Sequence, residues 1–137
     1  MFFKNVKPDT NEDLIKVCAL LIHAAKIDED YSFKEEKIIE QTLLKFDAKP
    51  DDLDEIITKA KEIEENSNQI LNFTKEVKNM DDKNKIKIVE ALWQIIYSNK
   101  QADIYETSLM RRLGGLLYID SKTMGDIKER IKKINSK

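Results

Sequence analysis

The sequence predicts an all-α fold, a single compact domain of about seven helices. Apolar residues recur every three or four positions from residue 14 to residue 134, which is the spacing that places them on one face of a helix. The chain contains only three glycines and two prolines, and it has no alternating apolar stretch or Asn-Gly turn of the kind that marks a β-hairpin. Because 137 residues is close to the commonest domain size, we expect one domain that covers residues 1–137.

Capping residues mark where the helices begin. Ser32 and Asp103 each stand three residues before a glutamate, which is the spacing of a capping box. Thr10 precedes the first apolar face as an N-cap does, and Pro50 suits a first turn because no helical hydrogen bond needs its missing N–H. We expect helices that begin near Thr10, Ser32, Pro50, Ile70, Asp81, Asp103 and Ser121.

The fifth expected helix begins at Asp81 and is the most apolar, so we place it at the centre of the fold. Trp93 lies on this helix, and we expect its buried indole N–H to reach a polar partner. Gly114 and Gly115 interrupt the sixth helix, where the close approach of a neighbouring helix would compensate for the low helix propensity of glycine. The expected core cluster contains Leu21, Val89, Leu92, Trp93, Ile96 and Leu113.

Two parts of the chain, about 10–63 and 81–135, carry the same pattern. When the sequence is shifted by 71 positions, Leu21 falls on Leu92 and the two capping boxes coincide. Caps, loop lengths and apolar positions all agree at this one shift, which indicates an internal duplication. We therefore expect a helical repeat with pseudo-two-fold symmetry.

Charge and composition exclude several classes of protein. The 24 basic and 26 acidic residues are interspersed, so the chain lacks the basic block that nucleic-acid binding needs. No apolar run reaches the roughly 18 residues of a transmembrane helix. Cys18 is the single cysteine, which rules out an intrachain disulfide and favours the reducing cytoplasm. No heptad seam persists over several heptads, so we expect a monomer or a weak dimer.

The residues that could carry catalysis are isolated in the sequence. His23 is the only histidine, and it lies at the edge of the apolar stripe of the first helix, where a partly buried packing role is expected. Cys18 falls on the apolar face itself, where a free thiol is usually inert. Because no nucleophile and base are paired, we expect that the protein is not an enzyme and needs no cofactor.

Several short segments carry a family resemblance. The sequence reads Ala-Leu-Leu-Ile-His-Ala-Ala-Lys-Ile-Asp at 19–28 and Glu-Ala-Leu-Trp at 90–93, with glutamates at 35 and 106. In these features the chain resembles the TerB-like family of tellurite-resistance proteins, over residues 14 to about 134. The resemblance implies an all-α fold of about seven helices with internal pseudo-two-fold symmetry. It also implies two acidic loops that lie near each other and that have been linked to divalent-cation binding.

The family hallmark is a loop that reads Ala-Asp-Gly, with a glutamate seven residues after the aspartate. The first loop of this chain keeps Asp28 and Glu35 but has Glu29 in place of the glycine. A turn that needs a positive φ is easy for glycine and strained for glutamate. The first loop therefore keeps the acidic groups of the family but lacks the glycine that suits a positive φ at the turn.

The second loop departs further from the family pattern. It keeps Glu106 but has Asn99 in place of the aspartate and Lys100 in place of the glycine. The lysine ammonium could neutralise the carboxylates directly and so stand in for a metal ion. The two glutamates could also do no more than close their capping boxes. If a metal binds, the resemblance implies the ligands Asp28, Glu35 and Glu106, for weakly held calcium, magnesium or manganese.

Two functions are compatible with these residues. The first is a non-enzymatic, cytoplasmic, stress-associated module that resembles the TerB-like family, contacts partner proteins through helix surfaces and has a degenerate metal site. The alternative is a weak divalent-cation-binding protein that uses the acidic loops of both repeats. The charge change in the second loop favours the first function.

Overall fold

A computed structural model of the chain describes residues 11–26, 33–67, 71–99 and 104–135. These residues form α-helices and two short 3-10 helices and contain no strand, which confirms the all-α prediction. None of the described helices has the length and hydropathy needed to cross a bilayer. The helices are α1 (Asn11–Ala25), α2 (Phe33–Lys45), α3 (Leu53–Glu65), α4 (Leu71–Lys78), α5 (Asp82–Ile96), α6 (Ile104–Leu116) and α7 (Ser121–Asn135), with 3-10 turns η1 (Pro50–Asp52) and η2 (Tyr97–Asn99).

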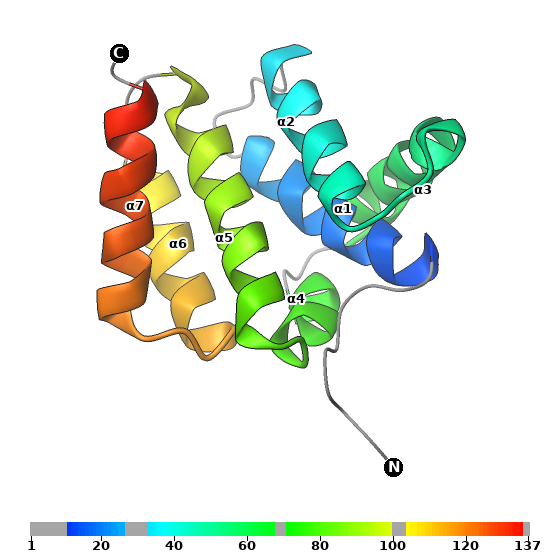
Figure 1. Cartoon of the computed structure of the whole chain (residues 1–137). Coiled ribbons are helices and arrows are strands. Elements are labelled where there is room, and N and C mark those ends of the chain that lie inside the picture. Colours follow the sequence, from blue (N-terminus) through cyan, green and yellow to red (C-terminus); the bar gives the residue numbers. More distant parts are fainter. Residues whose placement is uncertain (1–10, 27–32, 68–70, 100–103, 136–137) are drawn as a thin grey trace.

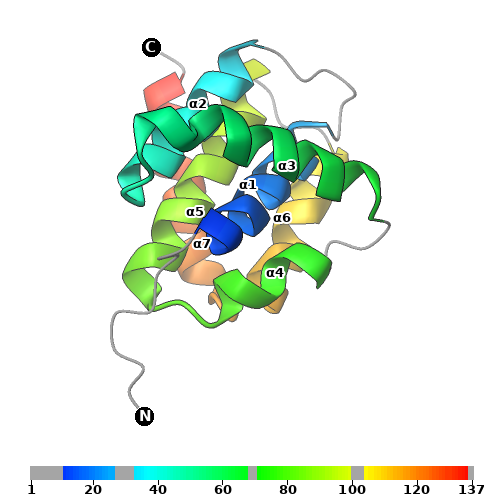
Figure 2. The same ribbon diagram turned by 90° about the vertical axis from the view of Figure 1, so that its right-hand side faces the viewer.

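The helices are arranged around α1 and α5, which pack against each other (Figure 1). The helix α3 lies along α1, and α7 lies along α5. The view in Figure 2 shows α3 crossing in front of α1, with α4 below it. The helix α2 contacts both central helices, while α6 contacts α4 and α7. Apart from α6, every other α-helix therefore contacts α1 or α5 directly.

The core predicted from the sequence is confirmed. All six residues of the expected cluster are buried within one continuous core, Trp93 being 4% exposed. The centre of the fold differs from the prediction, however, because α1 shares it with α5. Every residue from Val17 to Ile22 is buried, so α1 is covered on all sides and has no polar face along these turns.

Most predicted helix starts lie within one residue of the observed ones. Asp81 caps α5 as expected, because its side chain accepts a hydrogen bond from the backbone N–H of Asn84 at 3.0 Å. The third helix begins later than predicted, since Pro50 opens a 3-10 turn and α3 starts at Leu53. The expected caps Thr10, Ser32 and Asp103 lie outside the described residues.

The helices α2 and α6 end in the same way. Two residues have a positive φ without being glycine, Asp47 at 67° and Tyr118 at 59°. Each stands two residues after the end of its helix. Its backbone N–H group and that of the following residue donate hydrogen bonds to carbonyl groups of the helix, which is a Schellman motif. These residues are 71 positions apart, and the bounds of α1 and α2 plus 71 equal those of α5 and α6. The agreement supports the internal repeat, which remains a prediction.

The burial of Leu92 leads to a test of the core. Leu92 on α5 is 0% exposed, so Leu92→Ala should lower the free energy of unfolding by about 2–5 kcal/mol, because it leaves a cavity as well as removing apolar contacts. Leu44→Ala is the control: Leu44 is 42% exposed, and the loss there should be at most about 1 kcal/mol. Equal losses, measured by urea unfolding, would contradict the central position of α5.

Candidate functional site

The predicted metal ligands divide between described and undescribed residues. Asp28 and Lys100 lie outside the described part of the chain. For Asn99 and Glu106 only the backbone is described, at the end of η2 and in the first turn of α6. Glu35 is the candidate ligand whose side chain is described: it lies in the first turn of α2 and is 1% exposed.

The segments that flank the two acidic loops meet in the structure. Lys34, in the first turn of α2, donates a hydrogen bond from Nζ to the backbone O of Ser98 in η2, at 3.3 Å. The Ser98 hydroxyl in turn donates to the backbone O of Ile95 at 2.6 Å. Since Lys34 follows the first loop and Ser98 precedes the second, this contact joins residues that flank the two loops. The proximity of the loops themselves stays a prediction.

Lys34 was missed by sequence reasoning, which assigned the cation of this site to Lys100. The signal was present, because Lys34 stands directly before Glu35, but the sequence alone does not show that it faces the second loop. Among the residues that the structure describes, no group of three or more His, Cys, Asp or Glu side chains is placed to hold a metal ion. The described part of the site thus contains a buried carboxylate, a backbone carbonyl and an ammonium group.

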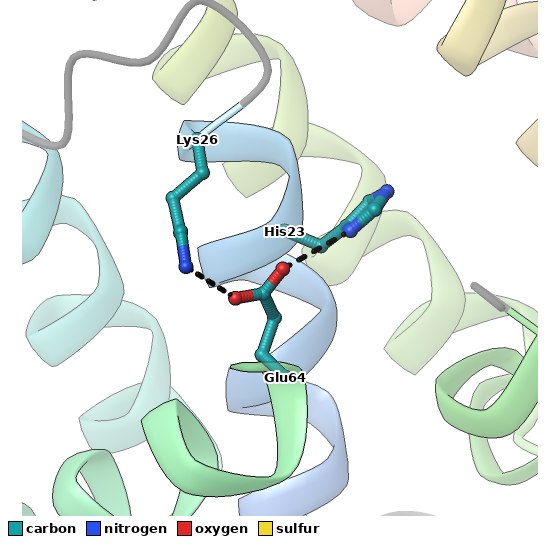
Figure 3. Close-up of polar contacts among 3 residues, drawn as sticks. All are labelled: His23, Lys26 and Glu64. Carbon is teal, nitrogen blue, oxygen red and sulfur yellow. Dashed lines mark hydrogen bonds and ion pairs between the residues drawn. The ribbon is translucent and has the colours of Figure 1, made fainter. Parts of the chain in front are cut away.

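A polar cluster joins the ends of α1 and α3 directly before the first loop (Figure 3). Glu64 on α3 accepts a hydrogen bond from Nζ of Lys26 at 2.7 Å, and its other oxygen lies 3.3 Å from Nδ1 of His23. The Glu64 side chain is 10% exposed and that of His23 is 33% exposed. The partly buried position of His23 agrees with the sequence prediction, whereas its pairing with Glu64, 41 residues away, was not foreseen. The cluster therefore links the end of α1 to the end of α3.

Cys18 lies inside the core, on the most buried turn of α1. Burial raises the pKa of the thiol from 9.0 to about 12, while Lys61 lowers it and Glu36 raises it to smaller extents. A thiol that stays protonated at neutral pH is a poor nucleophile. The structure therefore agrees with the inert role that the sequence predicted for this cysteine.

Tyr118 follows α6 and is unusual in both conformation and exposure. Its φ of 59° is left-handed, at the position where a Schellman motif favours glycine. Its side chain nevertheless projects into solvent, and the residue is 73% exposed. The ammonium groups of Lys78 and Lys85 lie 5.5 and 5.9 Å from the ring centroid, and Lys85 also donates to the backbone O of Leu117 at 2.9 Å. These contacts hold the ring in place without covering it.

A hollow of about 300 Å³ lies beside this ring, between α4 and the end of α6. Its walls include Lys75, Lys78, Leu116 and Tyr118, and none of its lining residues is acidic. We call these four residues the Tyr118 surface. It combines an exposed aromatic ring with two cations, a composition typical of protein contact sites for acidic segments.

The fold and these sites define an all-α protein in which residues flanking the connecting loops of two helix pairs contact each other. The protein-family comparison places the chain more closely: residues 14–129 match the model of the family described as tellurite resistance protein TerB, and the chain belongs to this family. No curated protein and no solved structure matched the chain.

The raised pKa of Cys18 predicts how the thiol reacts. At pH 8 the folded protein should react with Ellman's reagent far more slowly than the protein in urea, because only the exposed thiol forms appreciable thiolate. Rapid modification of the folded protein at pH 8 would contradict the burial of Cys18.

The same shift predicts a pH effect on stability. Because the pKa of the thiol is higher in the folded protein than in the unfolded one, its contribution to stability is fully present below pH 9. This contribution is lost as the pH rises from 9 towards 12, because the unfolded thiol then ionises and the folded one does not. The free energy of unfolding should therefore fall over this range more steeply for the natural chain than for Cys18→Ala, the control. Identical pH profiles for the two proteins would contradict the shift.

Proposed function

We propose that this member of the TerB family is a non-catalytic protein-interaction module in which a lysine ammonium takes the place of a divalent cation between the two acidic loops. A cytoplasmic location, a role in stress and a monomeric or weakly dimeric state belong to the same proposal. The family description, tellurite resistance, supports the stress role. The burial of Cys18 and the engagement of His23 with Glu64 support the non-catalytic role.

The observation that carries the metal part of the proposal is the hydrogen bond from Lys34 to Ser98. A backbone carbonyl beside an acidic loop is a ligand that calcium favours, and here a lysine ammonium donates to it. A second positive charge comes with Lys100, and Asn99 removes a negative one. These groups change the charge of the site in the direction that disfavours a cation.

The choice between a degenerate site and a cation-binding site depends on the size of the repulsion between the lysine ammonium and a divalent cation. A dication and an ammonium group about 5 Å apart repel by roughly 6–7 kcal/mol at an effective dielectric near 20. Exposed lysine side chains swing away and salt screens the charge, so the net penalty is smaller. A loss of about 4 kcal/mol still separates micromolar from millimolar affinity, which favours the degenerate site over the alternative, weak binding of calcium, magnesium or manganese.

The interaction part of the proposal rests on Tyr118. A left-handed conformation costs a non-glycine residue roughly 1–2 kcal/mol, and an exposed ring recovers little of this cost by burial. Residues in strained backbone conformations are concentrated at functional sites. We propose that the Tyr118 surface binds an acidic segment of a partner protein, with the ring as the apolar anchor and Lys75 and Lys78 as the complementary charges.

Calorimetry with calcium tests the metal part of the proposal. The unmodified protein should bind calcium with about millimolar affinity or weaker. The triple variant Lys34→Gln, Asn99→Asp and Lys100→Gly should bind at least about tenfold more tightly, because it removes two positive charges and adds a carboxylate.

Lys45→Gln is the matched control for this series, since Lys45 is an exposed lysine at the opposite end of α2. It should leave calcium affinity unchanged. Micromolar binding by the unmodified protein would contradict the proposal and establish the alternative function. A triple variant that binds no better than Lys45→Gln would show that these charges do not determine the site.

Tyr118→Gly tests whether the ring is kept for stability. Glycine removes the left-handed penalty of roughly 1–2 kcal/mol, while loss of the ring removes cation–π attraction of roughly 0.5–1 kcal/mol. The free energy of unfolding should stay unchanged or rise by up to about 1 kcal/mol. Asp47→Gly, at the corresponding position after α2, controls for the backbone effect. A loss above about 1 kcal/mol would mean that the ring is structural.

The partner is tested by placing a photo-crosslinking residue at position 118, with position 134 as the control, because Ile134 is also an exposed apolar residue. A specific partner should be captured from position 118 and should escape capture when Lys78→Glu is added. Once purified, it should bind the natural chain more tightly than Tyr118→Ala. Equal binding to both proteins would contradict a role for the Tyr118 surface.

A further inference from the structure

A separate cleft of about 390 Å³ opens between α5, α6 and α7. Its volume lies within the range of small-molecule sites. Apolar walls are supplied by Trp93, Met110, Ile119 and Met124. It lies on a different group of helices from the polar cluster around Glu64, and it shares only Gly115 with the hollow beside Tyr118.

All three glycines of the chain line this cleft. None of them has a positive φ, so the backbone does not require glycine at any of these positions, and a glycine within a helix lowers its stability relative to alanine. A Cβ added to Gly115 or Gly125 would meet no atom within 4 Å, and one added to Gly114 would lie 3.4 Å from Cγ of Met124. Close approach of a neighbouring helix can therefore explain the glycine at position 114 at most. The prediction that it also explains Gly115 is wrong.

The missing side chains leave the cleft open. At the positions 71 residues before Gly114 and Gly115 the chain has Leu43 and Leu44, and Leu43 is fully buried. Leu43 thus fills space in the core of the first half, whereas Gly114 leaves the corresponding position of the second half without a side chain. An open cleft that costs helix stability is the feature expected of a ligand site.

The polar groups of the cleft point to the charge of the ligand. Arg111 and Lys128 line it, and no lining residue is acidic. Neither cation makes an ion pair with a residue in the described ranges, and the Lys128 ammonium lies 5.6 Å from the centroid of the Trp93 ring. The side chains of Thr107 and Ser121 add two hydroxyl groups to the same walls.

Trp93 gives a second, independent indication of a ligand. The residue is 4% exposed, and its Nε1 has no hydrogen-bond partner within the described part of the chain, contrary to the expectation from the sequence. A buried N–H group without a partner is unfavourable and rare in folded proteins. An acceptor atom of a ligand bound in the cleft that Trp93 lines would remove this cost after a small adjustment of the ring.

We propose that this cleft binds a small amphipathic carboxylate, whose anionic head lies by Arg111 and Lys128 and whose apolar body covers Trp93 and Met124. The combination of cations, donors and apolar walls fits a carboxylate that carries a hydrocarbon chain better than a bare anion or a neutral apolar molecule. This site is independent of the proposed partner contact and of the loops. Gly125 lines this cleft and not the hollow beside Tyr118, so a substitution at this position distinguishes the two sites.

Trp93 is the only tryptophan of the chain, so its fluorescence reports on this cleft directly. Titration of the full chain with octanoate should change the emission in a saturable way. Octanamide, which has the same chain without the charge, and inorganic phosphate, which has the charge without the chain, should bind at least about tenfold more weakly. No saturable change with octanoate, or equal binding of either comparison compound, would overturn the proposal.

Two variants assign the binding to this cleft. Lys128→Gln should weaken octanoate binding about tenfold, whereas Lys122→Gln, on the same helix with its ammonium paired to Asp126, should not. Gly125→Leu should fill the cleft and abolish binding while circular dichroism shows an intact helical fold. If this variant does not fold, Gly125→Ala, whose Cβ meets nothing within 4 Å, takes its place and should weaken binding. Unchanged affinity in Lys128→Gln would overturn the proposal.

Discussion

The burial of every α1 residue from Val17 to Ile22 is the constraint on which the rest of the structure depends. A helix without a polar face is stable only when other helices cover it on all sides, and α2, α3, α4 and α5 all contact α1. Its buried turns sequester Cys18, and its last turn presents His23 and Lys26 to Glu64. In the sequence, the first acidic loop follows directly after that turn.

The contact between Lys34 and Ser98 joins the first turn of α2 to η2, beside the two acidic loops of the sequence. The helix pairs that flank the two loops are stabilised by apolar contacts in the core. On the proposed function, charge substitutions in the loops change what the site binds and leave this core in place. Membership of the TerB family thus establishes the architecture, and the individual side chains determine what the loops can bind.

Both of the other candidate sites lie where the chain departs from its local preferences. Tyr118 occupies a position that favours glycine, and Gly115 and Gly125 occupy helix positions where a larger residue would fit. Such departures reduce stability without improving the packing that the structure shows, so binding offers the physical reason for them. They also lie close together, because Gly115 lines both the ligand cleft and the hollow beside Tyr118. They are nevertheless separate sites, because Gly115 is the one lining residue that they share.

The sequence by itself determined the helices, the core and the family, because these depend on apolar periodicity, capping residues and local motifs. Asp81, Leu92 and the shift of 71 residues could all be recognised without coordinates. Only the tertiary structure decided which distant groups meet: Lys34 with Ser98, His23 with Glu64, and three glycines with Trp93. These contacts depend on how the helices cross, and helix crossing is set by the packing of whole surfaces, which local sequence patterns do not specify.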